Sequence, residues 1–330
     1  MSFLDEFISS IRRLYSYRSA SIFTVLVITI LVFYLITPEH RILSSPIISV
    51  ILRTVPELGI IAISVTLLMI CQEFDLSVGS VLALSSMVMV WSYKALGLHP
   101  ILAVFLALVV GSLIGALNGV VTVKFGIPSF ITTLGTMMWW RGVLLVVSGG
   151  HPKAFHPEVL YPAFESVLTG KIGGVFPVQF IWFLAITLII SILLERHKFG
   201  NQIYATGANK EAARAMGIDT DRIKIICFMI VGLLTAFAGC IQATRIYGSN
   251  ALQGTGLELE AIAATVIGGT ELFGGVGTII GTLFGVILVH VLRAGLLLVG
   301  FPAYWYKAGV GLLIVVAVVV NTTVTKRRGF

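Results

Sequence analysis

Residues 195–224, ERHKFGNQIYATGANKEAARAMGIDTDRIK, form a polar island between two long apolar runs. The middle of this island predicts a short helix. Asn209 is a favourable N-cap, Glu211 lies in the positive first turn, and Gly217 is a natural stop just after the last turn. The alanines between them give high helix propensity and a smooth surface that another protein could cover closely.

The apolar composition around this island predicts a membrane protein. Of the 330 residues, 57% are hydrophobic and only 11% are charged, which excludes an ordinary soluble domain. The runs have near-bilayer length, so we expect an all-α, polytopic integral membrane protein that forms a single domain over residues 1–330. About ten segments can be assigned on this basis, at 20–36, 56–70, 78–91, 100–123, 128–147, 178–194, 225–244, 259–269, 277–299 and 303–320.

The net charge of +7 is better explained by membrane orientation than by nucleic-acid binding. Its positive residues lie beside the apolar runs. With a cytoplasmic N-terminus, alternate crossings place Lys124, the 195–224 loop and the basic residues 326–328 on the cytoplasmic side. Both termini are then cytoplasmic, and residues 149–177 form the longest exterior stretch. A short interfacial helix is expected at 45–53, before the second span.

The three cysteines, Cys71, Cys227 and Cys240, lie in or beside apolar runs and have no CxxC spacing. They support neither a disulfide framework nor a zinc site, and no metal or cofactor site is expected in this chain. The sequence also has no GxxxxGK[ST] phosphate loop. The chain is therefore not expected to hydrolyse ATP by itself.

Two segments carry glycine at every fourth position: GSLIGALNGVV at 111–121 and GTIIGTLFGVI at 277–287. They lie five predicted spans apart, which is compatible with two halves inverted in the membrane. Independent selection for close helix packing explains them equally well. The glycines concerned are Gly111, Gly115, Gly119, Gly277, Gly281 and Gly285.

Two polar breaks interrupt the apolar pattern, QEFDLSVG at 72–79 and ELEAIAATVIGGTELFGGVGTIIGT at 258–282. A carboxylate so close to hydrocarbon must face water, protein or a helix N-terminus, so capping of the next helix by Asp75 or Ser77 is the structural alternative to a functional role. In the second break, the glycines permit a broken helix and Thr265 and Thr270 offer uncharged hydroxyls.

These motifs resemble the permeases of ABC importers, in particular the ribose, xylose and galactoside branch. DLSVG at 75–79, the long match at 258–282 and the EAA-type loop at 211–217 occur in the family's order. The resemblance implies a type II importer-like fold. Glu73, Glu260 and Glu271 depart from the family pattern, and their roles stay open.

The resemblance also implies site residues. The ATPase-coupling residues would be Asn209, Glu211, Ala212, Ala213, Arg214 and Gly217. The substrate pathway would include Asp75, Ser77, Asn118, Thr132, Thr133, Arg141, Thr265 and Thr270. Arg141 lies within a span and must find a polar partner, although a side chain that reaches the exterior surface is an equal alternative.

The leading hypothesis is the membrane subunit of an ABC importer that carries a monosaccharide inward by alternating access across the inner membrane. The expected partners are a cytoplasmic ATPase that binds ATP and Mg²⁺, an extracytoplasmic solute-binding protein, and a second copy or a paralogous permease. Related permeases would carry a nucleoside, an autoinducer or a branched-chain amino acid. A gradient-driven carrier and a membrane enzyme are the alternatives from other classes.

Overall fold

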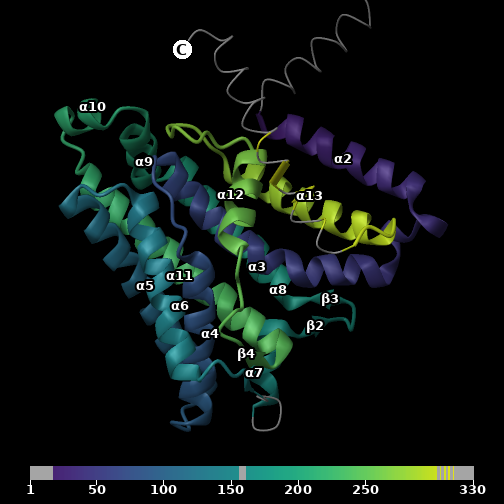
Figure 1. The fold of residues 1–330 in the computed structure, drawn as a ribbon. Helices are drawn as coiled ribbons and strands as arrows, with labels where there is room; N and C mark the ends of the chain where they lie inside the picture. Colours follow the sequence, from purple (N-terminus) through teal and green to yellow (C-terminus); the bar gives the residue numbers. More distant parts are fainter. Residues whose placement is uncertain are drawn as a thin grey trace, which may run out of the picture.

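The computed structural model describes residues 18–155 and 161–302, together with positions 305, 308, 309, 311, 312 and 315. The described chain is built from helices (Figure 1), as the composition predicts. Two short antiparallel strand pairs lie outside the helices, β1 (Lys153–Ala154) with β4 (Gly248–Ser249) and β2 (Lys171–Ile172) with β3 (Phe176–Pro177). The helices are α2 (Arg18–Ile36), η1 (Pro38–Leu43), α3 (Ser45–Ile70), α4 (Val78–Lys94), α5 (Pro100–Phe125), α6 (Ser129–Ser148), α7 (Pro162–Thr169), α8 (Val178–Arg196), α9 (Lys198–Ala208), α10 (Lys210–Ala215), α11 (Thr220–Ile246), α12 (Leu257–Ile267) and α13 (Ile279–Leu298).

Among the described residues, six helices are long and apolar enough to cross a membrane: α3, α5, α6, α8, α11 and α13. The other predicted segments before residue 300 correspond to α2, to the shorter α4 and to α12, which has only 11 residues. The tenth predicted segment, 303–320, and both chain ends lie mostly or wholly outside the described residues.

The predicted interfacial helix at 45–53 is wrong as a separate element. Residues 45–70 form one continuous helix, α3, with Pro56 inside it. Proline removes one backbone hydrogen bond and usually kinks or ends a helix in water. In a helix enclosed by neighbouring helices this single loss is tolerated, because the remaining backbone groups stay satisfied within the segment.

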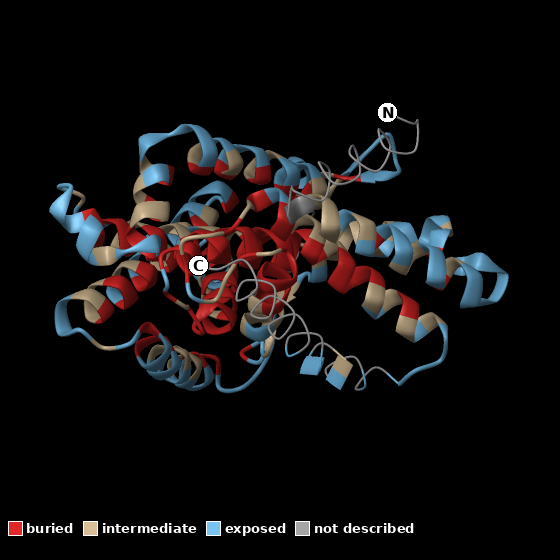
Figure 2. Cartoon of the chain, turned by 90° about the horizontal axis from the view of Figure 1, so that it is seen from above, coloured by how far each residue is buried: buried red, intermediate tan, exposed pale blue. Residues whose placement is uncertain are grey.

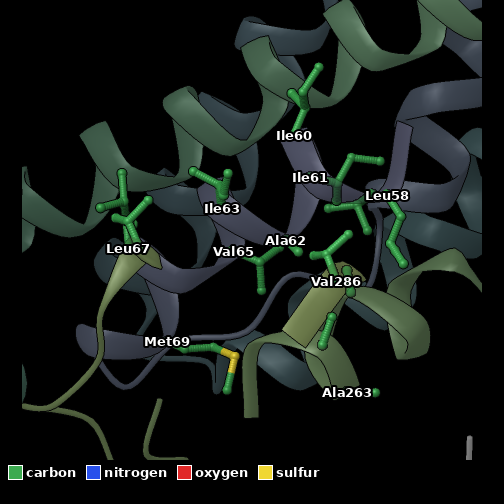
Figure 3. Close-up of a cluster of buried hydrophobic side chains, with 14 of the residues drawn as sticks. Leu58, Ile60, Ile61, Ala62, Ile63, Val65, Leu67, Met69, Ala263 and Val286 are labelled. Atoms are coloured by element: carbon green, nitrogen blue, oxygen red, sulfur yellow. The ribbon is translucent and has the colours of Figure 1, made fainter. Parts of the chain in front are cut away.

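Helix α3 is the centre of the protein. Every residue from Val55 to Ile70 is buried, which is the pattern of a helix covered on all sides. Buried residues gather in the middle of the molecule in Figure 2, and exposed residues cover the outer helices. Figure 3 shows the isoleucine and leucine side chains of α3 packed beside Ala263 of α12 and Val286 of α13.

The two glycine stripes lie at close helix contacts. A Cβ added at Gly115 of α5 would lie 2.1 Å from the carbonyl oxygen of Phe228 on α11. A Cβ at Gly285 of α13 would lie 2.1 Å from the carbonyl oxygen of Ala264 on α12. Backbones this close leave no space for a side chain, as in small-residue packing between membrane helices. Gly111 and Gly119 make equivalent approaches to α11, Gly281 approaches Gly268, and Gly277 lies against Ile70 and Thr270 in the connection before α13.

Candidate functional site

Helix α10 has the cap and the stop that its sequence predicts. The Asn209 side-chain oxygen accepts a hydrogen bond from the Ala212 N–H at 3.0 Å. Gly217 follows the helix with φ +83°, the left-handed conformation that glycine adopts without strain. The N–H of Ile218 bonds to the Ala213 carbonyl and that of Gly217 to the Arg214 carbonyl, which is a Schellman motif. Both ends of α10 are therefore fixed by local sequence.

Helix α10 is also fixed to the first turn of α11. The Arg214 guanidinium donates to both carboxylate oxygens of Asp221, at 2.7 and 2.6 Å, and to the Thr220 hydroxyl at 2.9 Å. The Lys210 ammonium lies 3.4 Å from the same carboxylate. Because Nη2 of Arg214 binds Asp221 and Nε binds Thr220, two nitrogens of the guanidinium hold α10 to the start of α11.

The rest of α10 is open to solvent. Only Ala213 is buried, whereas Glu211, Ala212 and Ala215 are exposed. Met216, just after the helix, leaves 83% of its surface exposed. Figure 1 shows α9 and α10 at one end of the molecule and β4 and α7 near the other. Sequence reasoning identified the alanines of this surface but missed Met216.

The first polar break brings four of the predicted pathway residues together. Asp75 is fully enclosed, and one of its carboxylate oxygens accepts hydrogen bonds from the Ser77 N–H at 2.7 Å and the Ser77 hydroxyl at 2.6 Å. The Asn118 amide of α5 donates to the Ser77 hydroxyl oxygen at 2.9 Å. Thr133 of α6 accepts from the Leu76 N–H at 3.0 Å. This cluster, Asp75–Ser77–Asn118–Thr133, therefore joins the break to α5 and α6.

The expectation that the Asp75 or Ser77 side chain caps α4 is wrong. Ser77 is the residue before α4, but its side chain makes no cap hydrogen bond to that helix. Asp75 accepts from the N–H of Ser77, one residue before the helix begins. Within the described residues, the Asn118 side-chain oxygen and the Thr132 hydroxyl are buried without a hydrogen-bond partner. Buried polar atoms without a partner are unusual in folded proteins.

The non-helical part of the second polar break, residues 268–278, contacts the first, because the Gln72 amide donates to the Phe273 carbonyl at 2.6 Å. The Gly275 N–H donates to the Ile70 carbonyl, at the end of α3, at 2.8 Å. Thr270 is buried here, and its hydroxyl has no partner among the described residues. Thr265 instead donates to the Ala62 carbonyl at 3.1 Å and so ties α12 to α3.

Helix α9, which sequence reasoning did not resolve, holds the second break. The Tyr204 hydroxyl donates to the Gly277 carbonyl at 2.8 Å. Burial raises the pKa of Tyr204 above its usual value, and the nearby Glu195 carboxylate raises it further. The hydroxyl therefore stays a neutral donor.

Arg141 lies apart from the Asp75–Ser77–Asn118–Thr133 cluster. Its guanidinium donates to the carbonyl oxygens of Ala251 and Gln253, the latter at 2.8 Å, in the stretch between β4 and α12. It is thus anchored to protein carbonyls, one of the partners that a cation within a span requires.

An ion pair also joins α3 to α11, between Glu57, which is buried, and Arg245, which is partly exposed. Gln242 also donates to Glu57, at 2.5 Å, and accepts a hydrogen bond from Gln253. Glu57, Gln242 and Arg245 line a cavity of about 360 Å³. Their polar atoms bind one another, so this network stabilises the packing of α3 on α11.

A central helix that is buried from Val55 to Ile70 and six candidate spans among the described residues are the features of a multi-pass membrane protein. Residues 47–318 match the family described as "Branched-chain amino acid transport system / permease component". The chain belongs to this family of permease components.

Relatives cover most of the chain. It is 36% identical over 307 residues to the xylose/arabinose import permease protein XylH of Sulfolobus acidocaldarius, which is 91% of this chain and 83% of that protein. It is 37% identical over 264 residues to the ribose import permease protein RbsC of Escherichia coli K12, at 80% and 81% coverage. It is 37% identical over 308 residues to the inner membrane ABC transporter permease protein YjfF of the same strain, at 91% and 92% coverage. No solved structure matches the chain.

Proposed function

We propose that this chain is the membrane-spanning subunit of an ATP-driven ABC importer that carries a monosaccharide into the cytoplasm. The observation that carries the proposal is the alignment of nearly the whole chain with permeases named for xylose, arabinose and ribose. The Asp75–Ser77–Asn118–Thr133 cluster suits such a cargo, since hydroxyl, amide and carboxylate groups can exchange hydrogen bonds with a polyhydroxylated solute.

The energy for transport would come from a separate cytoplasmic ATPase, which binds ATP and Mg²⁺. The sequence lacks a phosphate loop, and α10 offers an exposed, rigidly held surface of Glu211, Ala212, Ala215 and Met216. We expect the ATPase to bind this surface and move α10 as a rigid body. The two polar breaks would then repack and change which side of the membrane the pathway faces.

The remaining partners follow from this assignment. A solute-binding protein would deliver the cargo at the exterior end, near residues 149–177, and a second copy or a paralogous permease would complete the pathway. The whole chain would act as one permease domain in the cytoplasmic (inner) membrane, with both termini and the 195–224 loop on the cytoplasmic side. Thr132, Thr265, Thr270 and Arg141 remain proposed pathway residues in addition to the cluster.

Reconstitution tests the proposal. The chain is placed in vesicles with its ATPase inside and its binding protein outside, and uptake of labelled xylose, ribose and leucine is measured with and without ATP. We expect ATP-dependent uptake of a pentose and none of leucine. Uptake driven by an ion gradient without ATP would replace this proposal with a secondary carrier.

A further inference from the structure

The first polar break also contacts α9, α11 and the second polar break, and binding of a solute does not require these contacts. Gln72 has φ +64°, a left-handed conformation that is uncommon for a residue with a side chain. Its amide group donates to the Gly207 carbonyl of α9 at 2.8 Å and to the Phe273 carbonyl of the second break at 2.6 Å. One strained residue thus joins α9 to both polar breaks.

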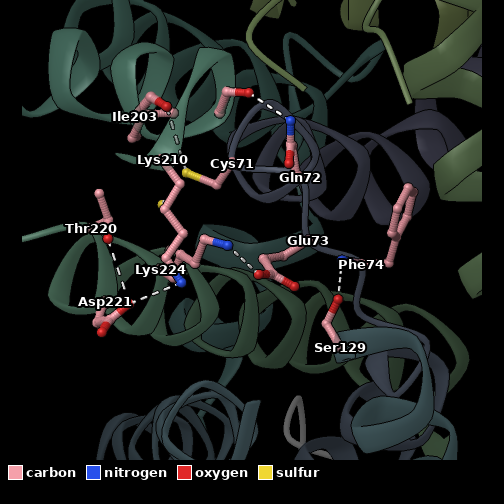
Figure 4. A network of polar contacts seen from close by, with 12 residues as sticks. Cys71, Gln72, Glu73, Phe74, Ser129, Ile203, Lys210, Thr220, Asp221 and Lys224 are labelled. Atoms are coloured by element: carbon pink, nitrogen blue, oxygen red, sulfur yellow. Dashed lines mark hydrogen bonds and ion pairs between the residues drawn. The ribbon is translucent and has the colours of Figure 1, made fainter. Parts of the chain in front are cut away.

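The next residue, Glu73, forms a buried ion pair with Lys224 of α11. Only 11% and 10% of the two side chains are exposed, so each charge depends on the other for its solvation. Figure 4 shows this pair beside Gln72 and the start of α11. Lys224 lies one helical turn beyond Asp221, the residue to which α10 is bound.

Polar contacts and one turn of α11 together therefore connect the exposed helix to the breaks. It leads from Arg214 of α10 to Asp221, along one turn of α11 to Lys224, and across to Glu73. From there the backbone continues to Asp75 in one direction and to Gln72 in the other. The carboxylate of the Glu57–Arg245 pair is also buried, but this pair joins α3 to the far end of α11, and among the described residues it makes no hydrogen bond to α9 or α10.

We propose that Gln72 and the Glu73–Lys224 pair are the coupling junction, the contacts through which displacement of α10 reaches both polar breaks. This inference rests on the proposed function, because it assumes that an ATPase moves α10. Glu73 and Gln72 are positioning residues in this account: they bind no solute and hold the breaks to the moving unit. This also gives a role to Glu73, which departs from the family's sequence pattern.

The test compares solute uptake with ATP hydrolysis in the same vesicles, for the complete complex with ATPase and binding protein. Glu73→Gln removes the charge and keeps the shape. We expect uptake per ATP hydrolysed to fall about tenfold, a typical size for energetic coupling between sites, while ATP hydrolysis continues. The exchanged pair Glu73→Lys with Lys224→Glu should recover part of the ratio.

Glu57→Gln is the matched control, because it removes the charge of another buried carboxylate that pairs with a cation of α11. It should lower the amount of folded complex but leave uptake per ATP unchanged. An unchanged ratio in Glu73→Gln, or the same behaviour in both variants, would overturn the junction.

If Glu73→Gln does not fold, uptake per ATP hydrolysed is measured for Gln72→Gly instead. Glycine adopts φ +64° without strain, so this change removes only the side-chain amide and its two hydrogen bonds. A lowered ratio supports the junction and an unchanged ratio overturns it. Failure of the proposed function is distinct, because the unaltered complex would then show no ATP-driven uptake.

Discussion

Gly207 of α9 lies against the carbonyl oxygen of Ile70, at the end of α3, so closely that an added Cβ would be 1.6 Å from that oxygen. The same Cβ would also lie 2.8 Å from the Gly275 nitrogen. Only glycine allows α9, α3 and the second break to meet at this point.

Gly207→Ala should therefore separate α9 from α3. All the atoms in the way belong to the backbone, so we expect a loss of about 1–3 kcal/mol in unfolding free energy, as for other overpacked sites. Thermal unfolding in detergent measures this. Gly135→Ala in α6 is the control, since a Cβ there meets nothing within 4 Å. Equal unfolding temperatures for the two variants would contradict the contact.

The surface of α10 provides a second prediction. Met216→Asp introduces charge at an exposed position, so the permease should fold normally but retain much less ATPase on co-purification. Leu96→Asp is the control, because it makes the same kind of change at a residue that is also exposed (69%) but lies in the loop between α4 and α5. Normal ATPase retention by Met216→Asp would remove this residue from the docking surface.

A third prediction concerns the Asp75–Ser77–Asn118–Thr133 cluster. Asp75→Ala leaves the buried Ser77 N–H and hydroxyl without their acceptor, at a cost of about 1–3 kcal/mol, and should strongly reduce uptake. Asp75→Asn retains an acceptor oxygen and should recover most of the stability. Thr187→Val in α8 removes a hydroxyl that bonds only to the Phe183 carbonyl, and should leave uptake intact. Full uptake by Asp75→Ala would exclude Asp75 from the pathway.

The buried hydroxyls of Thr66 in α3 and Thr282 in α13 lie 2.7 Å apart and provide a fourth prediction. Replacement of either threonine by valine should cost about 1 kcal/mol of unfolding free energy, because the other hydroxyl loses a partner. The double variant should cost less than the sum of the single ones. Unfolding in denaturant measures all three, and strict additivity would mean that the two hydroxyls do not interact.

The sequence predicts local features of this protein well. The cap and stop of α10 depend on Asn209 and Gly217 themselves, and the spans depend on apolar length, so both could be read from short windows. The motif at Asp75 also lies in a cluster of polar side chains in the structure. Asn118 was assigned to the same pathway only through the family resemblance, and no local pattern predicted its hydrogen bond to Ser77.

Long-range relationships could not be predicted in this way. Glu73 and Lys224 are 151 residues apart, and neither has a local signal that names the other. The continuity of α3 through Pro56 depends on the helices that enclose it, which no local window contains. Gln72 adopts its unusual backbone conformation because of partners on α9 and the second break, not because of its own preference.

The central claim is that α10 lies on the cytoplasmic side and forms the surface to which a separate ATPase binds. Glu211→Cys tests it most directly, since Cys71, Cys227 and Cys240 are buried and give little background labelling. We predict that an impermeant thiol reagent labels residue 211 only from the cytoplasmic side, that bound ATPase blocks this labelling, and that a short crosslinker joins the two proteins there. Labelling from the exterior side, or unhindered labelling in the assembled complex, would contradict the account.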